Sequence, residues 1–186
     1  MNLSYRKAGI RDLKAIIDLL KEDELGSSRE SSELDQSYIE AFHQIDQDPH
    51  QYLMIVELDG QIVGTCHLTM MPSLSFRGST RMQIEAVRVS TKHRGQMIGE
   101  WMLKEALSYG QAKGASIFQL MTNKERLKAQ DFYKKLAFEA THEGMKLFIK
   151  YGCLSCSRFL PSMNTNSSQN VILSNMKKKL EPPSKK

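Results

Sequence analysis

The sequence has no long apolar run and few cysteines. No stretch of about 18 consecutive apolar residues occurs, so we expect no helix that spans a membrane. The first residues, MNLSYRKAGIRDLK, lack the apolar segment of a secretory signal. The three cysteines, Cys66, Cys153 and Cys156, are too few and too unevenly spaced for a disulfide framework. These absences predict a protein of the reducing cytoplasm.

Sequence motifs for several common sites are also absent. Neither G-x-x-x-x-G-K-[ST] nor G-x-G-x-x-G occurs, so we expect no P-loop and no dinucleotide-binding fold. Cys153 and Cys156 have the spacing of metal ligands but no second ligand pair nearby, which argues against a bound metal. Cys66 precedes His67 in a predicted strand, where neighbours point to opposite faces, so the two cannot form a catalytic pair. Cys66 is expected in the core.

The net charge of +5 comes from the end of the chain. Residues 151–186 contain six basic side chains and one acidic side chain, whereas the first 150 residues carry 20 of each. This end is also rich in Ser, Asn, Lys and Pro, which is typical of disorder. We therefore expect one folded domain, residues 1–152, followed by a disordered basic tail, residues 153–186. No nucleic-acid partner is expected, because the sequence lacks a basic and aromatic surface pattern.

Hydrophobic periodicity predicts alternating strands and helices. The clearest local signal is a hairpin, QYLMIVELDGQIVGTCHLTMM, in which Asp59-Gly60 joins two apolar runs. A helix that ends at Gly114 separates two later strands, which makes that pair parallel. The predicted fold is α/β (α+β), a mixed, mostly antiparallel twisted sheet of about seven strands flanked by about four helices. The other strands are expected at 2–8, 81–90, 116–122, 138–140 and 145–151, and the other helices at 10–20, 36–45 with Asp35 as N-cap, and 125–136.

The turn before the central helix carries the first chemical signal. In VRVSTKHRGQMIGEWMLKEAL, residues 87–107, a strand meets a helix through Lys92, His93 and Arg94. The first four N–H groups of a helix have no internal partner and lie at the positive end of its dipole. The segment therefore predicts an anion site, most simply one for phosphate.

Two motifs in this sequence resemble those of one family. RGQMIG, residues 94–99, resembles the R/Q-x-x-G-x-G/A signature of the GNAT superfamily of acyl-CoA-dependent N-acetyltransferases. Asn123, Ala129 and the stretch FYKKLAF, residues 132–138, are similar to that family's N-x-x-A-x-x-F-Y-x-x-L-G-F pattern, with the first spacing only roughly matched. Both motifs stand in the family's order, and the resemblance covers roughly residues 2–151.

The resemblance implies a GNAT fold with acetyl-CoA as co-substrate and no metal. It also implies that backbone N–H groups of the turn bind the pyrophosphate of coenzyme A, while the end of the preceding strand binds the pantetheine arm. The residues implied in cofactor binding are Val87, Arg88, Val89, Arg94, Gly95, Gln96, Met97, Ile98, Gly99 and Asn123.

The sequence departs from the family pattern at two positions. Met97 and Ala137 stand where the two motifs have glycine. We expect Met97 in the first helical turn with φ below zero, with its side chain turned away from the phosphates and into the core. If the methionine instead blocks the phosphate path, the chain would be a non-catalytic member of the family.

Two side chains are candidates for proton transfer. The resemblance implies that Glu85 in QIEAVRV deprotonates the amine and that Tyr133 protonates the leaving thiolate. Strand alternation places Gln83, Glu85 and Val87 on one face, and Ile84, Ala86 and Arg88 on the other. A surface or ion-paired role for Glu85 and a core role for Tyr133 remain as alternatives.

The sequence thus favours an N-acetyltransferase that moves acetyl from acetyl-CoA directly to a primary amine in a ternary complex. The alternative is a cofactor-binding or interaction module of the same fold without turnover. The acceptor is expected to be a small-molecule amine or a peptide amine, and Glu30, Glu33 and Asp35 favour a cationic small molecule. The sequence leaves open whether the chain forms a homodimer.

Overall fold

The computed structural model describes residues 2–31 and 33–147. Residues up to 141 in that part form one unit, and residues 142–147 carry no helix or strand. The strands are β1 (Leu3–Lys7), β2 (Gln51–Leu58), β3 (Gln61–Pro72), β4 (Thr80–Val89) and β5 (Ala115–Leu120). The helices are η1 (Ile10–Asp12), α1 (Leu13–Lys21), α2 (Glu24–Ser27), α3 (Gln36–Gln47), α4 (Ser75–Gly78), η2 (Thr91–His93), α5 (Ile98–Ala112) and α6 (Leu127–Lys135).

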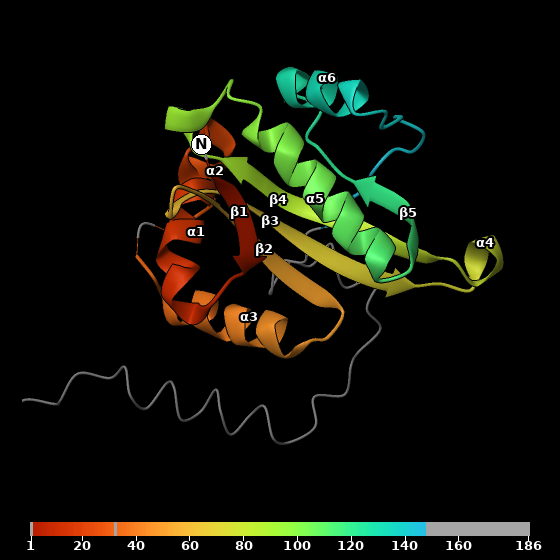
Figure 1. The fold of residues 1–186 in the computed structure, drawn as a ribbon, viewed down its shortest axis with the longest axis horizontal. Coiled ribbons are helices and arrows are strands. Elements are labelled where there is room, and N and C mark those ends of the chain that lie inside the picture. Colours follow the sequence, from red (N-terminus) through yellow and green to blue (C-terminus); the bar gives the residue numbers. More distant parts are fainter. Residues whose placement is uncertain (1, 32, 148–186) are drawn as a thin grey trace, which may run out of the picture. The chain divides into compact units, whose positions relative to one another are not determined.

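The five strands form one sheet in the order β1-β2-β3-β4-β5. The first four strands pair antiparallel with their neighbours, whereas β4 and β5 are parallel. α5 follows β4 and precedes β5 in the chain, so it makes the crossover connection that a parallel pair requires. Figure 1 shows α5 lying along the sheet. The predicted mixed α/β sheet and its helical crossover are confirmed.

Alternating side chains of the strands build two cores, one on each face of the sheet. In β2, Met54 and Val56 pack with residues of α5, whereas Leu53 and Ile55 pack with residues of α1 and α3. Both faces of β2 are covered, which explains why its sequence is a continuous apolar run. Cys66 belongs to the core on the α5 side, as expected from the sequence.

Several local predictions are confirmed by the backbone. Asp59 and Gly60 have φ of 50° and 82°, as a two-residue hairpin turn requires. The Asp35 side chain caps α3 by accepting from two backbone N–H groups. Gly114 follows α5 with φ of 86° and donates its N–H to the carbonyl of Gln111 at 2.9 Å.

The predicted strand at 138–140 was wrong, because the chain there closes the end of α6. Ala137 has φ of 63°, and its N–H donates to the Lys134 carbonyl at 3.0 Å. Phe138 donates to the Tyr133 carbonyl at 3.1 Å, and the two rings lie 6.0 Å apart. This is a Schellman C-cap with its usual apolar contact.

The remaining strand and the tail fall largely outside the described part. Of the strand predicted at 145–151, only residues 145–147 are described, and they are not extended into a strand. The described part therefore has five strands where about seven were expected. The predicted boundary at residue 152 and the tail at 153–186 lie outside the described residues.

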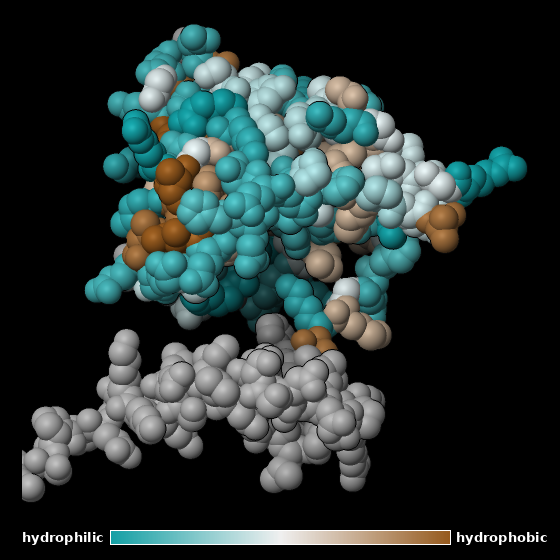
Figure 2. Space-filling model, turned by 90° about the horizontal axis from the view of Figure 1, so that it is seen from below, coloured by the Kyte–Doolittle hydropathy of each residue, from teal (hydrophilic) through white to brown (hydrophobic). Residues whose placement is uncertain are grey.

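One face of the described part is mainly polar. Figure 2 shows a largely hydrophilic face, on which hydrophobic side chains gather in a few separate groups. The longest helix, α5, has 15 residues, and none of the helices in residues 2–31 and 33–147 has the length and apolarity to cross a bilayer.

Candidate functional site

A β-bulge in β4 defines which side chains share a face. Ala86 has φ of 51°, and the register between β3 and β4 shifts there, because Thr65 pairs with Arg88 while His67 pairs with Glu85. One extra residue in β4 reverses the alternation after it. The predicted grouping of Glu85 with Val87 was therefore wrong. Val87 packs with the core on the α5 side, as Ile84 does, whereas Glu85 is exposed on the other face.

The second half of β4 has a free edge. Its pairing with β5 ends at Ile84 and Leu120, so within residues 2–31 and 33–147 no strand lies beside the later residues of β4 on that side. Ser90 donates its N–H to Val63 of β3. Since backbone groups alternate in direction along a strand, those of Val87 and Val89 point away from β3. An extended ligand with amide groups fits this edge.

Two arginine side chains already bind carbonyl groups near this edge. Arg88 Nη1 donates to the carbonyl of Val87 at 2.9 Å, and Arg94 Nε donates to the carbonyl of Val89 at 3.3 Å. The two carbonyls are therefore accessible to donors. An incoming amide N–H would replace one of these guanidinium contacts.

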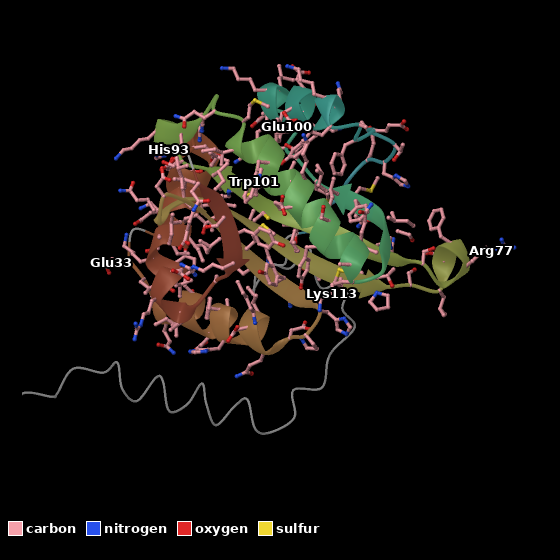
Figure 3. All side chains as sticks on the ribbon, in the orientation of Figure 1. Glu33, Arg77, His93, Glu100, Trp101 and Lys113 are labelled. Carbon is pink, nitrogen blue, oxygen red and sulfur yellow. The ribbon has the colours of Figure 1, made fainter. Side chains whose placement is uncertain are left out.

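The edge leads directly into the predicted phosphate turn. Residues 94–97 are exposed, and Gly95 has φ of 79°. Ile98 begins α5, and among the described residues no side-chain hydrogen bond caps the helix N-terminus. Its first N–H groups therefore need a partner from outside the helix. Figure 3 shows His93 in the turn beside this end of α5, with Glu100 and Trp101 on the helix that follows.

Met97 adopts a conformation that the sequence did not predict. It is the N-cap of α5 with φ of 62° and ψ of 6°, and the residue is 69% exposed. The expected negative φ and core-facing side chain were therefore wrong. Glycine suits this position because the left-handed region carries no penalty for a residue without Cβ. The backbone N–H of Met97 is still present in the turn, as that of a glycine would be.

α6, which carries Tyr133, approaches the first turn of α5 at Gly99. A Cβ at Gly99 would lie 3.4 Å from the Phe132 ring, so the glycine allows α6 to approach. The Tyr133 ring lies 5.3 Å from the Phe132 ring. Burial raises the pKa of Tyr133, while the charges of Arg88 and Arg126 lower it. The phenol thus keeps its proton at neutral pH and can act as a donor.

His67 is a functional candidate that sequence reasoning missed. It faces Glu85 across the two strands, and burial lowers its pKa, although the Glu85 charge raises it. Its Nε2 is buried and has no hydrogen-bond partner within the described part of the chain. A neutral imidazole beside a carboxylate can accept a proton. The sequence showed only that His67 adjoins Cys66. Its pairing with Glu85 depends on the register between β3 and β4, which only the structure shows.

Asn123 and Cys66 have structural roles in the described chain. Asn123 is exposed, and its Oδ1 accepts from the Glu125 N–H at 3.0 Å in the turn before α6. Its assignment to the cofactor remains a prediction. Burial raises the pKa of Cys66 to about 12, so this thiol is a poor nucleophile. Within residues 2–31 and 33–147, no group of three or more His, Cys, Asp or Glu side chains could hold a metal.

Comparison with known proteins agrees with this geometry. The chain matches the sequence model of the Acetyltransferase (GNAT) family over residues 13–138. That range contains the free edge of β4, the turn that precedes α5, and α6. Both motifs that suggested the family in the sequence thus lie within the match.

Three similar proteins illustrate the range of this likeness. A crystal structure of a transcriptional regulator from Bacillus halodurans has 36% identity and a TM-score of 0.77, covering 80% of this chain and 100% of that one. A predicted acetyltransferase from Clostridium acetobutylicum, solved with acetyl-CoA, has 20% identity and a TM-score of 0.63, covering 79% and 96%. A putative ribosomal protein alanine N-acetyltransferase from Bacillus subtilis is 25% identical over 98 residues, 53% of this chain and 60% of that protein.

Proposed function

Because the chain belongs to the Acetyltransferase (GNAT) family, we propose that it transfers an acetyl group from acetyl-CoA to a primary amine by direct attack in a ternary complex. The observation that carries this proposal is the continuity of the free β4 edge with the open N-terminus of α5. Backbone groups of Val87 and Val89 would bind the pantetheine amides. The turn at residues 94–99 would bind the pyrophosphate.

The proposed reaction requires removal of a proton from the amine. A primary amine with a pKa of about 10.4 is mostly protonated at pH 7, which costs about 4.6 kcal/mol relative to the free base. Glu85 takes this proton, directly or through water, and His67 lies opposite it on the same face. Exposure of Glu85 on the face away from α5 leaves it accessible to an acceptor.

Acetyl-CoA supplies the activated acetyl group, and its thiolate leaves. Tyr133 returns a proton to the leaving sulfur, which its protonated phenol can do at neutral pH. Holding the amine and the thioester together supplies much of the remaining rate. No covalent enzyme intermediate is needed, which agrees with the buried and weakly acidic Cys66.

Ligand-dependent stability separates this cofactor from other nucleotides. Acetyl-CoA at a hundredfold excess over Kd stabilises the native state by about 2.7 kcal/mol. NAD and ATP lack the pantetheine arm, so we expect much smaller shifts in melting temperature. Equal shifts with all three ligands would exclude the assignment to acetyl-CoA. Binding of acetyl-CoA without acetyl transfer to any amine, and therefore without release of CoA thiol, would support the cofactor-binding module instead.

A further inference from the structure

The acidic residues of the predicted acceptor segment serve the fold. The Tyr38 hydroxyl donates to Glu30 at 2.9 Å, and Asp35 caps α3 through the N–H groups of Ser37 and Tyr38. Both carboxylates therefore form hydrogen bonds within the segment that leads from α1 into α3. The sequence-based preference for a cationic acceptor therefore loses two of its three supporting residues.

Two basic side chains gather at the N-terminus of α2, the short helix between α1 and α3 in the chain. Asp23, the N-cap of α2, lies 2.6 Å from Arg126 Nη2 and 3.7 Å from Arg88 Nη2. The Asp23 carboxylate also accepts the N–H of Gly26 at 2.6 Å. One carboxylate thus serves two guanidinium groups and a helix N-terminus. We call Asp23, Arg88 and Arg126 the arginine cluster.

The arginine cluster has more positive charge than its carboxylate balances. The side chains of Arg88 and Arg126 are only 12% and 24% exposed, and the two guanidinium groups share the single Asp23 carboxylate. Arg88 Nε is buried and has no hydrogen-bond partner in the part of the chain that is described. A buried donor without a partner is costly, as is a buried charge that is not fully paired. An additional anion would satisfy both.

The arginine cluster lies beside the groups assigned to the reaction. Arg88 belongs to the free half of β4, and its guanidinium also contacts the Val87 carbonyl at that edge. The positive charges of Arg88 and Arg126 both lower the pKa of the Tyr133 phenol, against the larger effect of burial. The β4 bulge turns Arg88 to the face on which Glu85 lies. An anion bound here would lie on the same face of β4 as Glu85.

We propose that Arg88 and Arg126 bind an anionic group of the acceptor, so that the amine substrate carries a carboxylate or a phosphate. This inference rests on the proposed acetyl transfer and names its substrate class. Arginine suits both anions, because its planar guanidinium donates two parallel hydrogen bonds to either group. Asp23 orients the two guanidinium groups in the absence of substrate.

Matched pairs of acceptors test the proposal and identify the anion. Release of CoA thiol is measured with acetyl-CoA and each of the L-amino acids, and with the corresponding amino acid amides. A second pair is glucosamine 6-phosphate and glucosamine. We expect kcat/KM to be at least 10-fold higher for the anionic member of one pair. The pair that shows the preference distinguishes a carboxylate from a phosphate.

Variants then assign the preference to the arginine cluster. Arg88→Gln and Arg126→Gln should each raise KM for the anionic acceptor at least 10-fold. Arg126→Gln should do so while the affinity for acetyl-CoA, measured by calorimetry, changes less than threefold. Arg88→Lys should recover part of the loss, because it keeps the charge without the planar fork. Arg77→Gln, at the exposed tip between β3 and β4, is the matched control and should leave KM unchanged.

The outcomes separate this inference from the proposed function. Equal kcat/KM for anionic and neutral acceptors would overturn the anion proposal and leave acetyl transfer standing. An equal fall in kcat for every acceptor in Arg88→Gln would also overturn it, since the arginine would then act on the reaction itself. Binding of acetyl-CoA without acetylation of any acceptor would overturn both proposals.

Discussion

His67 of β3 and Glu85 of β4 are direct cross-strand partners, immediately beside the bulge at Ala86. Side chains in such a pair lie on one face of the sheet and within reach of one another. The Glu85 charge raises the pKa of His67, but burial lowers it by more, so the net shift is downward. The pair therefore combines an exposed carboxylate with a half-buried neutral imidazole.

Replacing Glu85 should expose the cost of amine deprotonation. We expect Glu85→Gln to lower kcat about 100-fold at pH 7, and less at pH 9, where more of the amine is already free base. The measurement is the pH dependence of kcat and kcat/KM for one acceptor. His67→Gln should cause a smaller loss if the imidazole supports the carboxylate, and His50→Gln, at an exposed position, is the control. Wild-type turnover in both Glu85→Gln and His67→Gln would place the base elsewhere.

Removing one oxygen from Tyr133 tests the proton donor. Tyr133→Phe keeps the ring contacts with Phe132 and Phe138, so the fold should be retained. We expect kcat to fall about 100-fold, with little change in KM or in the affinity for acetyl-CoA. Steady-state kinetics and calorimetry provide the comparison. An increase in KM with unchanged kcat would instead assign Tyr133 to binding.

Glycine at position 97 should stabilise the protein. Met97 has φ of 62°, a region that favours glycine, so Met97→Gly should raise the free energy of unfolding by about 0.5–1 kcal/mol. Met97→Ala retains the Cβ and should bring no such gain. Ala137→Gly should act in the same direction, because Ala137 has φ of 63°. Denaturant titration measures all three variants.

The effect of Met97→Gly on cofactor binding separates an active enzyme from a degenerate one. The exposed methionine side chain leaves the backbone of the turn in place, so we expect the affinity for acetyl-CoA to change less than tenfold. A hundredfold gain in affinity on replacement by glycine would mean that the side chain blocks the phosphate path. That result would favour the cofactor-binding module.

Acid should remove the contribution of one ion pair in the N-terminal region. Asp12 accepts from Arg6 at 2.6 and 2.9 Å and from the Gly9 N–H at 2.7 Å, and the Arg6 contacts are the main reason why its pKa is lowered. Because the pKa of Asp12 is lower in the folded state, its ionised form stabilises the protein at pH values above the unfolded-state pKa of about 3.9. This contribution is lost as the pH falls through the folded-state pKa.

Asp12→Asn should therefore cost about 1–3 kcal/mol at pH 7 and progressively less below about pH 4. Urea titrations of the two proteins at a series of pH values give this difference directly. Lys14→Gln, which removes an exposed ion pair with Asp18, serves as the control and should have little effect at any pH. A pH-independent difference between Asp12→Asn and wild type would contradict the assigned cause.

Sequence reasoning predicted features whose signals lie close together in the chain. The Asp59-Gly60 turn, the Asp35 cap and the Gly114 terminus each depend on a few neighbouring residues, and each is confirmed. The parallel β4–β5 pair followed from the length of the helical connection. The glycine-rich turn and the Tyr133 segment pointed to the family for the same reason, because their motifs are contiguous.

Features that depend on partners far away in the sequence were missed. Strict alternation placed Val87 with Glu85, because the bulge at Ala86 arises from the pairing of β4 with β3. The arginine cluster joins α2, β4 and the turn before α6, and none of these segments carries a motif for it. Positive φ at Met97 was missed because helix propensity was applied to a residue that caps the helix instead of lying within it.

The most direct test of acetyl transfer is an initial-velocity study of CoA release. Acetyl-CoA and one acceptor amine are varied together, and the acetylated amine is identified by mass spectrometry. Attack in a ternary complex predicts that thiol release requires the amine, that acetylated amine forms in equal amount, and that double-reciprocal plots intersect. Thiol release without amine and parallel plots would indicate an acetylated enzyme and would contradict direct transfer.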